Sequence, residues 1–230
     1  KISIDGEFTP IKQAKGKYEF NSNNVLKYGE SELHYPSIIS ITPEFCRLLG
    51  YYAAEGSATI DARLTFGGHE MQYAEDALAC VEKTFGVKGH YSFGNKQKTA
   101  LAVNFGGALA KELLHQVFKT GNHAEFKQIP PIIFNVPNAL KIEFLRGYFR
   151  GDGNLRFGRK GCKLWASTIS RKLAADLVFI IRQLGGWATV QKKPVKGKMK
   201  HVAYHICITD RDSLKLLHDV AMDLAKDNAG

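Results

Sequence analysis

The sequence lacks the features of a membrane or secreted protein. It has no run of about 18 apolar residues, the length that a membrane-spanning helix needs, and no signal peptide at its start. Its four cysteines lie far apart and form no C-x₂-C pair, which argues against a zinc site and against a disulfide framework. We therefore expect a cytoplasmic protein whose cysteines are reduced and mostly buried.

Acidic residues are also in short supply. The chain has 22 Asp and Glu against 32 Lys and Arg, which gives a net charge of +10 and a pI of about 9.4. This charge favours a polyanionic partner, with nucleic acid as the first candidate and an anionic membrane surface as the second. At 230 residues, the chain can bury a full core as one domain or as two small ones.

The chain does contain one segment in two copies. Residues 45–57 read FCRLLGYYAAEGS, and residues 142–154 read IEFLRGYFRGDGN. An alignment without a gap pairs Gly50 with Gly147, Tyr51 with Tyr148, Glu55 with Asp152 and Gly56 with Gly153. Each copy predicts an apolar helix that ends in one acidic residue.

Small residues lie four positions apart in each copy, at Gly50 and Ala54 and at Gly147 and Gly151. This spacing places them on one face of a helix, where another helix can approach closely. Glycine inside a helix costs about 1 kcal/mol relative to alanine, and close packing is the usual reason for it. Because both copies have this face, we expect the two helices to pack against each other.

The acids Glu55 and Asp152 come last in these helices, before Gly56 and Gly153, which we expect to be left-handed C-caps. Packing the helices together brings both carboxylates close to several C-terminal carbonyl groups. The helix dipole makes this end partly negative, so a cation is needed to neutralise the acids. Oxygen ligands of this kind suit Mg²⁺, for which Mn²⁺ can substitute.

The two copies carry a resemblance to a known family. LLGYYAAEG at 48–56 and FLRGYFRGDG at 144–153 resemble the signature helices of the LAGLIDADG homing endonucleases, in their monomeric double-motif form. The segment KQIPPIIFNVP at 127–137 leads into the second motif as in archaeal members. The resemblance implies a site-specific endonuclease that reaches genomic DNA and makes double-strand breaks by Mg²⁺-dependent phosphodiester hydrolysis.

The resemblance also implies roles for particular residues. Glu55 and Asp152 would bind the metal directly, and the backbone carbonyls of Ala54 and Gly151 would contribute. Lys127 is similar to a basic residue of the family that activates solvent or stabilises the transition-state charge. Its counterpart at an offset of 103 would be Gly230, and Lys226 is only a weak substitute. The family's polar residues before the helix of each half would be His69 or Glu70 and Thr168 or Ser170.

The remaining residues repeat as well. Residues 63–85 match residues from 163 onward at an offset of 100, and residues 101–103 match 204–206 at an offset of 103. In the first half we expect a motif helix from Pro43, a strand near 62–66, a helix over 70–85, strands near 89–93 and 99–105 and a helix over 107–119.

This order, αββαββα in each half, predicts an α+β fold of two tandem repeats related by a pseudo-twofold axis. Two antiparallel sheets would form a DNA-binding saddle, with the two motif helices packed at its centre. We expect an N-terminal extension at 1–41, a first subdomain at 42–119, a linker at 120–137 and a second subdomain at 138–230. The extension contains Lys12, Lys15, Lys17 and Lys27 and is either a basic arm along DNA or a segment packed on the core.

Recognition of DNA is assigned to the strands and the hairpin tips, since β-ribbons fit the major groove. Basic tips usually contact phosphates, whereas Arg, Asn and Gln on a sheet face can read bases. The residues expected to bind DNA are Arg63, Thr65, Lys96, Lys98, Asn154, Arg156, Arg159, Lys163, Trp165, Gln191, Lys193, Lys198 and Lys200.

Two other functions fit parts of the pattern. An RNA maturase or a non-cleaving DNA-binding regulator of the same fold would keep the charge and the repeat, and a maturase could also keep both acids. A structural or membrane-surface protein would explain the charge but not the paired acids. The ends of the chain lack the residues of a complete intein, so we expect an intron-encoded enzyme, although an excised intein domain would look similar.

Overall fold

The structure is a computed structural model that describes residues 2–4, 7–9, 18–20, 25–28, 34–36, 38–58, 61–94, 96–158, 161–194 and 201–227. The side chains of residues up to 34 and of residues 226 and 227 are outside this description.

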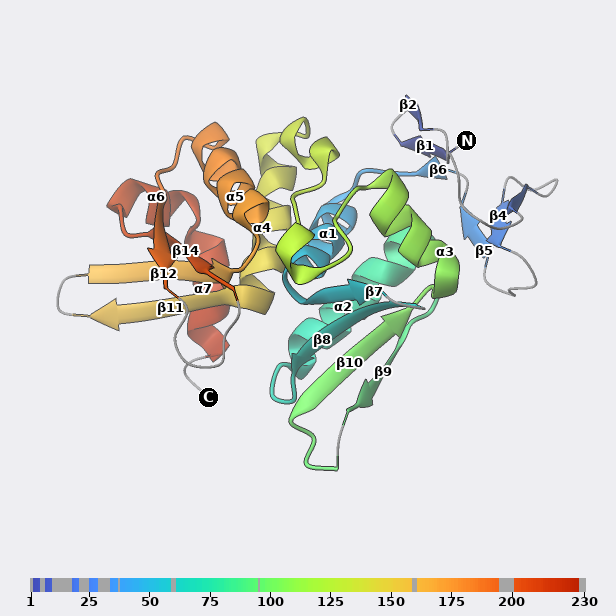
Figure 1. Ribbon diagram of the computed structural model, residues 1–230, viewed down its shortest axis with the longest axis horizontal. Coiled ribbons are helices and arrows are strands. Elements are labelled where there is room, and N and C mark those ends of the chain that lie inside the picture. Colours follow the sequence, from blue (N-terminus) through green and yellow to red (C-terminus); the bar gives the residue numbers. More distant parts are fainter. Residues whose placement is uncertain are drawn as a thin grey trace.

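A pair of helices lies at the centre of the molecule: α1 (Pro43–Glu55) and α4 (Asn138–Asp152) (Figure 1). The helix α1 begins as predicted, because the Thr42 hydroxyl accepts a hydrogen bond from the Phe45 amide at 3.2 Å and proline follows the cap. The two helices meet at their glycines, so the expected close packing is confirmed.

The contact between these helices has the symmetry of the sequence repeat. A Cβ atom on Gly50 would lie 2.1 Å from the carbonyl oxygen of Phe144, and one on Gly147 would lie 2.1 Å from that of Arg47. Since Phe144 is the counterpart of Arg47 in the alignment, the same contact is made twice. Any side chain at either glycine would therefore collide with the backbone of the facing helix.

Each half adds a four-stranded antiparallel sheet of the same strand order. The first sheet has the order β7 (Gly56–Ala58), β8 (Ala62–Gly67), β10 (Ala100–Phe105) and β9 (His90–Phe93). The second has the order β11 (Gly153–Gly158), β12 (Gly161–Thr168), β14 (Ala203–Ile208) and β13 (Thr189–Lys193). The sheets extend from the helix pair in different directions (Figure 1). The predicted fold class is confirmed.

The other helices cover the sheets. They are α2 (Met71–Phe85), α3 (Gly107–Glu112), α5 (Arg171–Gln183), α6 (Arg211–Leu216) and α7 (His218–Asp227), with 3-10 turns at Ala124–Phe126 and Pro131–Phe134. The helix predicted over about 107–119 is present but changes type along its length. The α-helix α3 continues as a π-helical turn, Leu113–Val117, and the Phe118 amide donates to the Leu113 carbonyl at 2.8 Å.

The N-terminal strands form two three-stranded sheets. The first has the strand order β2 (Glu7–Thr9), β1 (Ile2–Ile4) and β6 (Ile38–Ile39). The second has the strand order β3 (Tyr18–Phe20), β4 (Val25–Tyr28) and β5 (His34–Pro36). Tyr35 attaches β5 to the core, because its buried hydroxyl donates to the Gly106 carbonyl at 2.6 Å. This end of the extension is thus packed on the core. Lys12, Lys15 and Lys17 lie outside the described residues, as does the side chain of Lys27.

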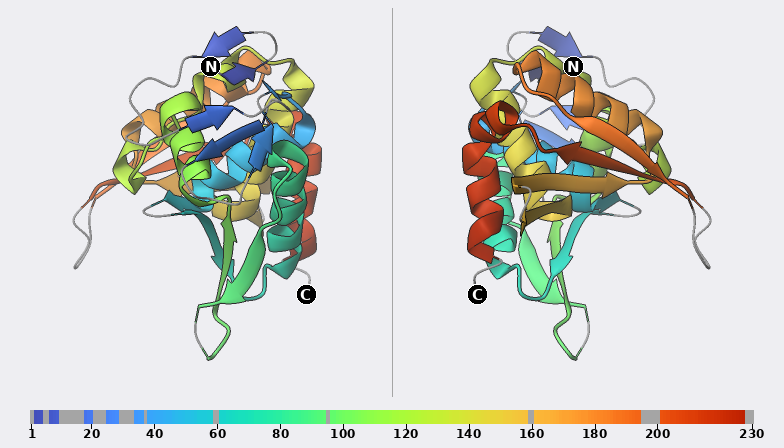
Figure 2. Two further views of the ribbon diagram at one scale, coloured as in Figure 1. Left: turned by 90° about the vertical axis from the view of Figure 1, so that its right-hand side faces the viewer. Right: turned by 90° about the vertical axis from the view of Figure 1, so that its left-hand side faces the viewer.

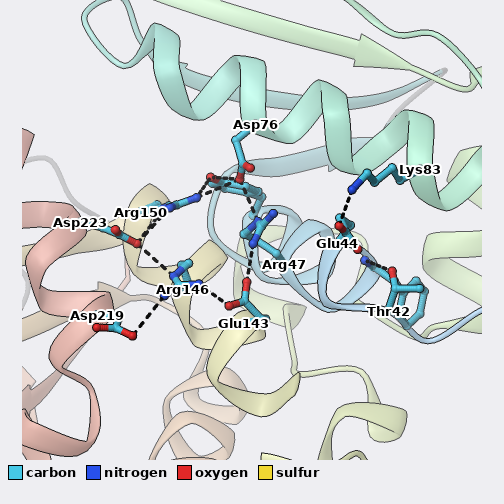
Figure 3. A network of polar contacts seen from close by, with 12 residues as sticks. Thr42, Glu44, Arg47, Asp76, Lys83, Glu143, Arg146, Arg150, Asp219 and Asp223 are labelled. Atoms are coloured by element: carbon cyan, nitrogen blue, oxygen red, sulfur yellow. Dashed lines mark hydrogen bonds and ion pairs between the residues drawn. The ribbon is translucent and has the colours of Figure 1, made fainter. Parts of the chain in front are cut away.

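A network of charged side chains joins the two halves beside the central pair (Figure 3). Asp76 on α2 binds Arg47 on α1 and Arg150 on α4, each at 2.9 Å. Arg150 also binds Asp223 on α7 at 3.0 Å, and Arg47 binds Glu143 on α4. The helices α2 and α7 lie on the same side of the molecule (Figure 2), and the Tyr73 hydroxyl on α2 donates a hydrogen bond to the Asp223 carbonyl on α7 at 3.3 Å. No helix in the described part of the chain is long and apolar enough to cross a membrane.

The four cysteines form no disulfide in the structure, and Cys46, Cys80 and Cys207 are buried while Cys162 is partly buried. The expected burial of most of these side chains is confirmed. The remaining core is apolar and continuous from the first half through the central helices into the second. It fixes the positions of the helix ends that carry the acids.

Candidate active site

Glu55 and Asp152 are the last residues of α1 and α4, where both helices pass directly into the first strand of a sheet. The predicted left-handed caps at the next residues are wrong. Gly56 has φ −72° and Gly153 has φ −82°, which is extended backbone that any residue can adopt. Glycine is needed there because a Cβ would lie 2.3 Å from the Tyr52 carbonyl oxygen in one case and 2.1 Å from that of Phe149 in the other.

The two acids lie close together across the helix pair. A Cβ on Gly151 would be 2.9 Å from Glu55 Cγ and 3.4 Å from Glu55 Oε1, so the side chain of Glu55 crosses the end of α4 next to Asp152. The missing side chain at Gly151 is what leaves room for it. Glu55 and its neighbour on α4 thus form one site rather than two separate helix ends.

Burial raises the pKa of both carboxyl groups, and nearby negative charges add to this shift. Burial, together with the negative charge of Asp152, raises the pKa of Glu55 to about 8. Burial also raises the pKa of Asp152 to about 6. The positive charge of Lys127 opposes both shifts, whereas Glu70 adds to them. Two neighbouring buried acids with raised pKa values need a cation before both can be ionised.

Lys127 reaches this site from the linker. Its ammonium donates a hydrogen bond to the carbonyl of Ala54, the residue before Glu55. Burial lowers the pKa of Lys127, and the negative charges of Asp152 and Glu55 only partly oppose this shift. The resemblance assigned the Ala54 carbonyl to the metal; here its partner is the lysine. Lys127 therefore supplies a positive charge at the C-terminal end of α1, where the helix dipole favours one.

The residues present fit a divalent cation of the Mg²⁺ type. Among the described residues, no three His, Cys, Asp or Glu side chains gather into a metal site, so a purely protein cage is absent there. Two carboxylates and nearby backbone carbonyls are oxygen donors, and Mg²⁺ is commonly held by one or two carboxylates together with substrate phosphates and water. Glu55 and Asp152 are the residues that would hold it.

The raised pKa values predict how stability depends on pH. Because folding raises both pKa values above those of the unfolded chain, the protonated acids stabilise the fold at low pH. This contribution is lost as pH rises through about 6 and about 8. We expect the metal-free protein to melt at a lower temperature at pH 8.5 than at pH 5. Mg²⁺ should raise the melting temperature more at pH 8.5, where it does not compete with protons.

Melting curves with EDTA and with Mg²⁺ at the two pH values would check this. The Glu55→Gln, Asp152→Asn double variant is the control, since it has no acid to titrate at the site. Equal metal effects at both pH values, or the same behaviour in the double variant, would show that the acids do not bind the ion.

The predicted recognition residues fall on the outward faces of the two sheets. Along β8, Ala62, Leu64 and Phe66 are buried, while Arg63 and Thr65 between them are exposed. In the second sheet the register pairs Asn154 with Trp165 and Arg156 with Lys163 on one face, and Gln191 and Lys193 on β13 are exposed. Lys96 and Lys98 are exposed in the β9–β10 hairpin. Arg159, Lys198 and Lys200 lie outside the described residues.

The same faces include residues that the sequence reading missed. Asn104 on β10 lies opposite Arg63 on β8, and its Oδ1 accepts a hydrogen bond from Arg63 Nε at 2.7 Å. His205 stacks on Trp165 with ring centroids 5.2 Å apart, and burial together with Lys193 and Lys163 lowers its pKa. The signal for both was cross-strand register, which a sequence gives only after the sheet order is known.

The polar residues before α2 and α5 have structural partners. The Glu70 carboxylate accepts from the Gly67 amide at 2.5 Å. The Thr168 hydroxyl accepts from the Ser170 amide at 3.1 Å, and Ser170 caps α5 by accepting from the Leu173 amide at 3.1 Å. Ser170 is fully buried.

Comparison with known proteins agrees with this geometry. Residues 139–220 match the family model of a LAGLIDADG-like domain. The homing endonuclease I-DmoI in complex with DNA and Mn has a similar structure, with a TM-score of 0.56 and 14% identity over 79% of this chain and 97% of that chain. The N-terminal LAGLIDADG domain of DUF199/WhiA is similar with a TM-score of 0.54 and 12% identity, over 78% of this chain and 82% of that domain.

Sequence relatives are archaeal. Uncharacterized protein MJ1054 of Methanocaldococcus jannaschii is 29% identical over 93% of this chain, and the DNA polymerase II large subunit of Thermococcus kodakarensis is 28% identical over 70% of it. The chain spans a quarter of the first relative's length and 9% of the second's.

Two symmetric sheets around a glycine-packed helix pair that ends in two acids define the LAGLIDADG fold, and the structural similarity confirms it. The match of residues 139–220 to the model of a LAGLIDADG-like domain, together with the similar structures, confirms the resemblance noted in the sequence.

Proposed function

We propose that this chain is a site-specific DNA endonuclease that hydrolyses both strands of a duplex at the Glu55 and Asp152 site. The observation that carries the proposal is the convergence of two buried acids, from equivalent positions of a repeat, with one lysine at the same helix ends. A duplex has local twofold axes that relate its strands, so a pseudo-twofold protein can present one acid towards each strand.

The residues have distinct tasks in this proposal. Glu55 and Asp152 hold a divalent ion, which when bound lowers the pKa of water and neutralises charge on the phosphate. Lys127 places a fixed positive charge beside the acids and stabilises the negative charge that develops on the phosphate. The buried surroundings strengthen these interactions because little water screens them.

The sheet faces would position the duplex. Arg63 and Asn104 on the first sheet and Asn154, Arg156 and Gln191 on the second are of the residue types that read base edges. Lys163 and Lys193 would contact phosphates. Similar structures support this, since I-DmoI is described in complex with DNA together with Mn or Ca.

The sequence relatives also support an origin of this chain as a mobile genetic element. They include a DNA polymerase II large subunit, a DNA helicase and an aminotransferase, and the matching part is 9–20% of each. These proteins have no activity in common, so the shared segment accounts for the matches. We infer that the chain is of the type inserted into unrelated archaeal proteins, which favours an intein-derived origin over the free-standing intron origin expected from the sequence.

The test is incubation of the protein with random-sequence duplexes, in Mg²⁺ and in EDTA, followed by sequencing of new ends and of retained DNA. We expect double-strand ends around one sequence in Mg²⁺ alone. If the protein retains duplexes that share one sequence but does not cut them in Mg²⁺ or in Mn²⁺, the result would instead favour a DNA-binding regulator. Retention of structured RNA but not of duplex would favour a maturase.

The basic sheet face predicts salt-dependent affinity. Lys163→Ala and Lys193→Ala should each weaken binding to all duplexes and reduce the slope of log affinity against log salt by about one. Filter binding over a range of salt concentrations measures this slope. Lys83→Ala is the matched control, because it removes the same charge from α2, where Lys83 binds Glu44 at 2.7 Å. Equal slopes for all four proteins would place the DNA elsewhere.

A further inference from the structure

The linker breaks the twofold symmetry of the molecule. Each motif helix has a counterpart, but the segment that carries Lys127 occurs once, and the sequence has Gly230 at the position equivalent to Lys127. A lysine on an irregular segment needs other contacts to hold it, because no helix or strand fixes its backbone. The structure provides these contacts from α5.

Ser170 makes the first contact. Its hydroxyl donates to the backbone carbonyl of Lys127 at 2.6 Å while accepting from the Leu173 amide at 3.1 Å. The single donor of this buried hydroxyl therefore holds the lysine's own backbone, while an acceptor position of the same oxygen caps the start of α5.

Asp176, six residues after Ser170 on α5, makes the second contact. Its Oδ2 accepts from the Ile129 amide at 3.2 Å, and its Oδ1 binds Lys172. Asp176 is buried, with 7% of its surface exposed. Residues 127 and 129 are thus both held by side chains from the N-terminal part of α5 and its cap.

The two halves use equivalent acids differently. At an offset of 100, Asp76 is the counterpart of Asp176, yet Asp76 binds Arg47, Arg150 and the Tyr51 hydroxyl, and so joins α1, α2 and α4. The second half instead turns its acid towards the linker. This difference assigns α5 a task that α2 does not have.

We propose that Ser170 and Asp176 are positioning residues, a clamp that holds the linker so that the Lys127 ammonium stays on the Ala54 carbonyl beside the acids. The geometry of the clamp is independent of any activity. Its effect on the rate rests on the function proposed above.

The clamp is tested by a double-mutant cycle. Ser170→Ala should lower the rate of DNA cleavage roughly tenfold at saturating duplex, since small displacements of a catalytic group cost one to two orders of magnitude. Ser170→Thr keeps the hydroxyl and should restore the rate. In the Lys127→Met protein, Ser170→Ala should have no further effect, because the group that it positions is already gone.

Loss of the α5 cap is controlled separately. Asp210→Ala removes the cap of α6, where the Asp210 carboxylate accepts from the Ser213 amide at 2.9 Å, and has no contact with the linker. Each substitution removes the side-chain cap of one helix, so the two variants should lose stability to a similar extent. If Asp210→Ala slows cleavage as much as Ser170→Ala, or if Ser170→Ala is equally harmful without Lys127, the effect is general destabilisation and the clamp is refuted.

A second readout does not need activity. Acetic anhydride labelling followed by peptide mass spectrometry reports the accessibility of each lysine amine. Labelling of Lys127 should rise severalfold in Ser170→Ala and in Asp176→Leu, and should not change in Asp210→Ala. Unchanged labelling in all three refutes the clamp even if the protein cleaves DNA. Increased labelling in a protein that never cleaves upholds the clamp and refutes the proposed function.

Discussion

Glu55→Gln and Asp152→Asn are each expected to lower double-strand cleavage by roughly 10²- to 10³-fold, the cost of removing a group that stabilises transition-state charge. The amides keep the shape of the side chains but lose the negative charge that holds a divalent ion. Binding to the same duplex should stay within a few fold, or tighten, because removing negative charge near DNA reduces repulsion. Gel separation of intact, nicked and cut duplex, with binding measured in parallel, gives both quantities.

The comparison needs a variant with the same chemical change elsewhere. Glu75→Gln serves, since Glu75 is exposed on α2. Its cleavage rate should equal that of the unmodified protein. An acid variant that retains full double-strand cleavage with unchanged affinity would remove that acid from the active site.

The second large effect concerns stability. Gly50→Ala and Gly147→Ala are each expected to lower the free energy of unfolding by about 3 kcal/mol, the upper part of the range for overpacking a core. In each case the new Cβ would lie 2.1 Å from a backbone carbonyl oxygen of the facing helix, so the helices must separate. Separation also moves Glu55 and Asp152 apart, and cleavage should fall with stability.

Gly94→Ala is the matched control for these variants. At Gly94 the new Cβ would lie 3.7 Å from the Cβ of Ala100, an ordinary contact, and the stability should be nearly unchanged. Chemical denaturation at constant pH measures all three. If Gly50→Ala and Gly147→Ala are as stable as Gly94→Ala, the close approach of α1 and α4 is wrong.

The repeat explains why much of this fold could be predicted from the sequence. Alternating burial in β8 and small residues four apart in α1 and α4 are local patterns, and each has one structural solution. Duplication gives each of these patterns a second occurrence, because the order of elements in the first half recurs in the second. The outward placement of Arg63 and Thr65 followed from parity alone.

The errors have equally specific causes. Gly56 and Gly153 could be required by a left-handed backbone or by close approach, and a sequence does not distinguish these. The pairs that join Asp76 to Arg150 and Ser170 to Lys127 link residues 74 and 43 positions apart, and no local pattern encodes them. The roles of Glu55, Asp152 and Lys127 and the division into subdomains stay predictions.

One measurement tests the central claim most directly, namely that the paired acids at the ends of α1 and α4 cut DNA. The unmodified protein and the Glu55→Gln, Asp152→Asn double variant are purified side by side and incubated with the same random duplex library in Mg²⁺. All new ends are then sequenced. We predict ends clustered at one sequence, on both strands, for the unmodified protein alone. Ends at that sequence from the double variant would contradict the account, because the hydrolysis would then come from another site.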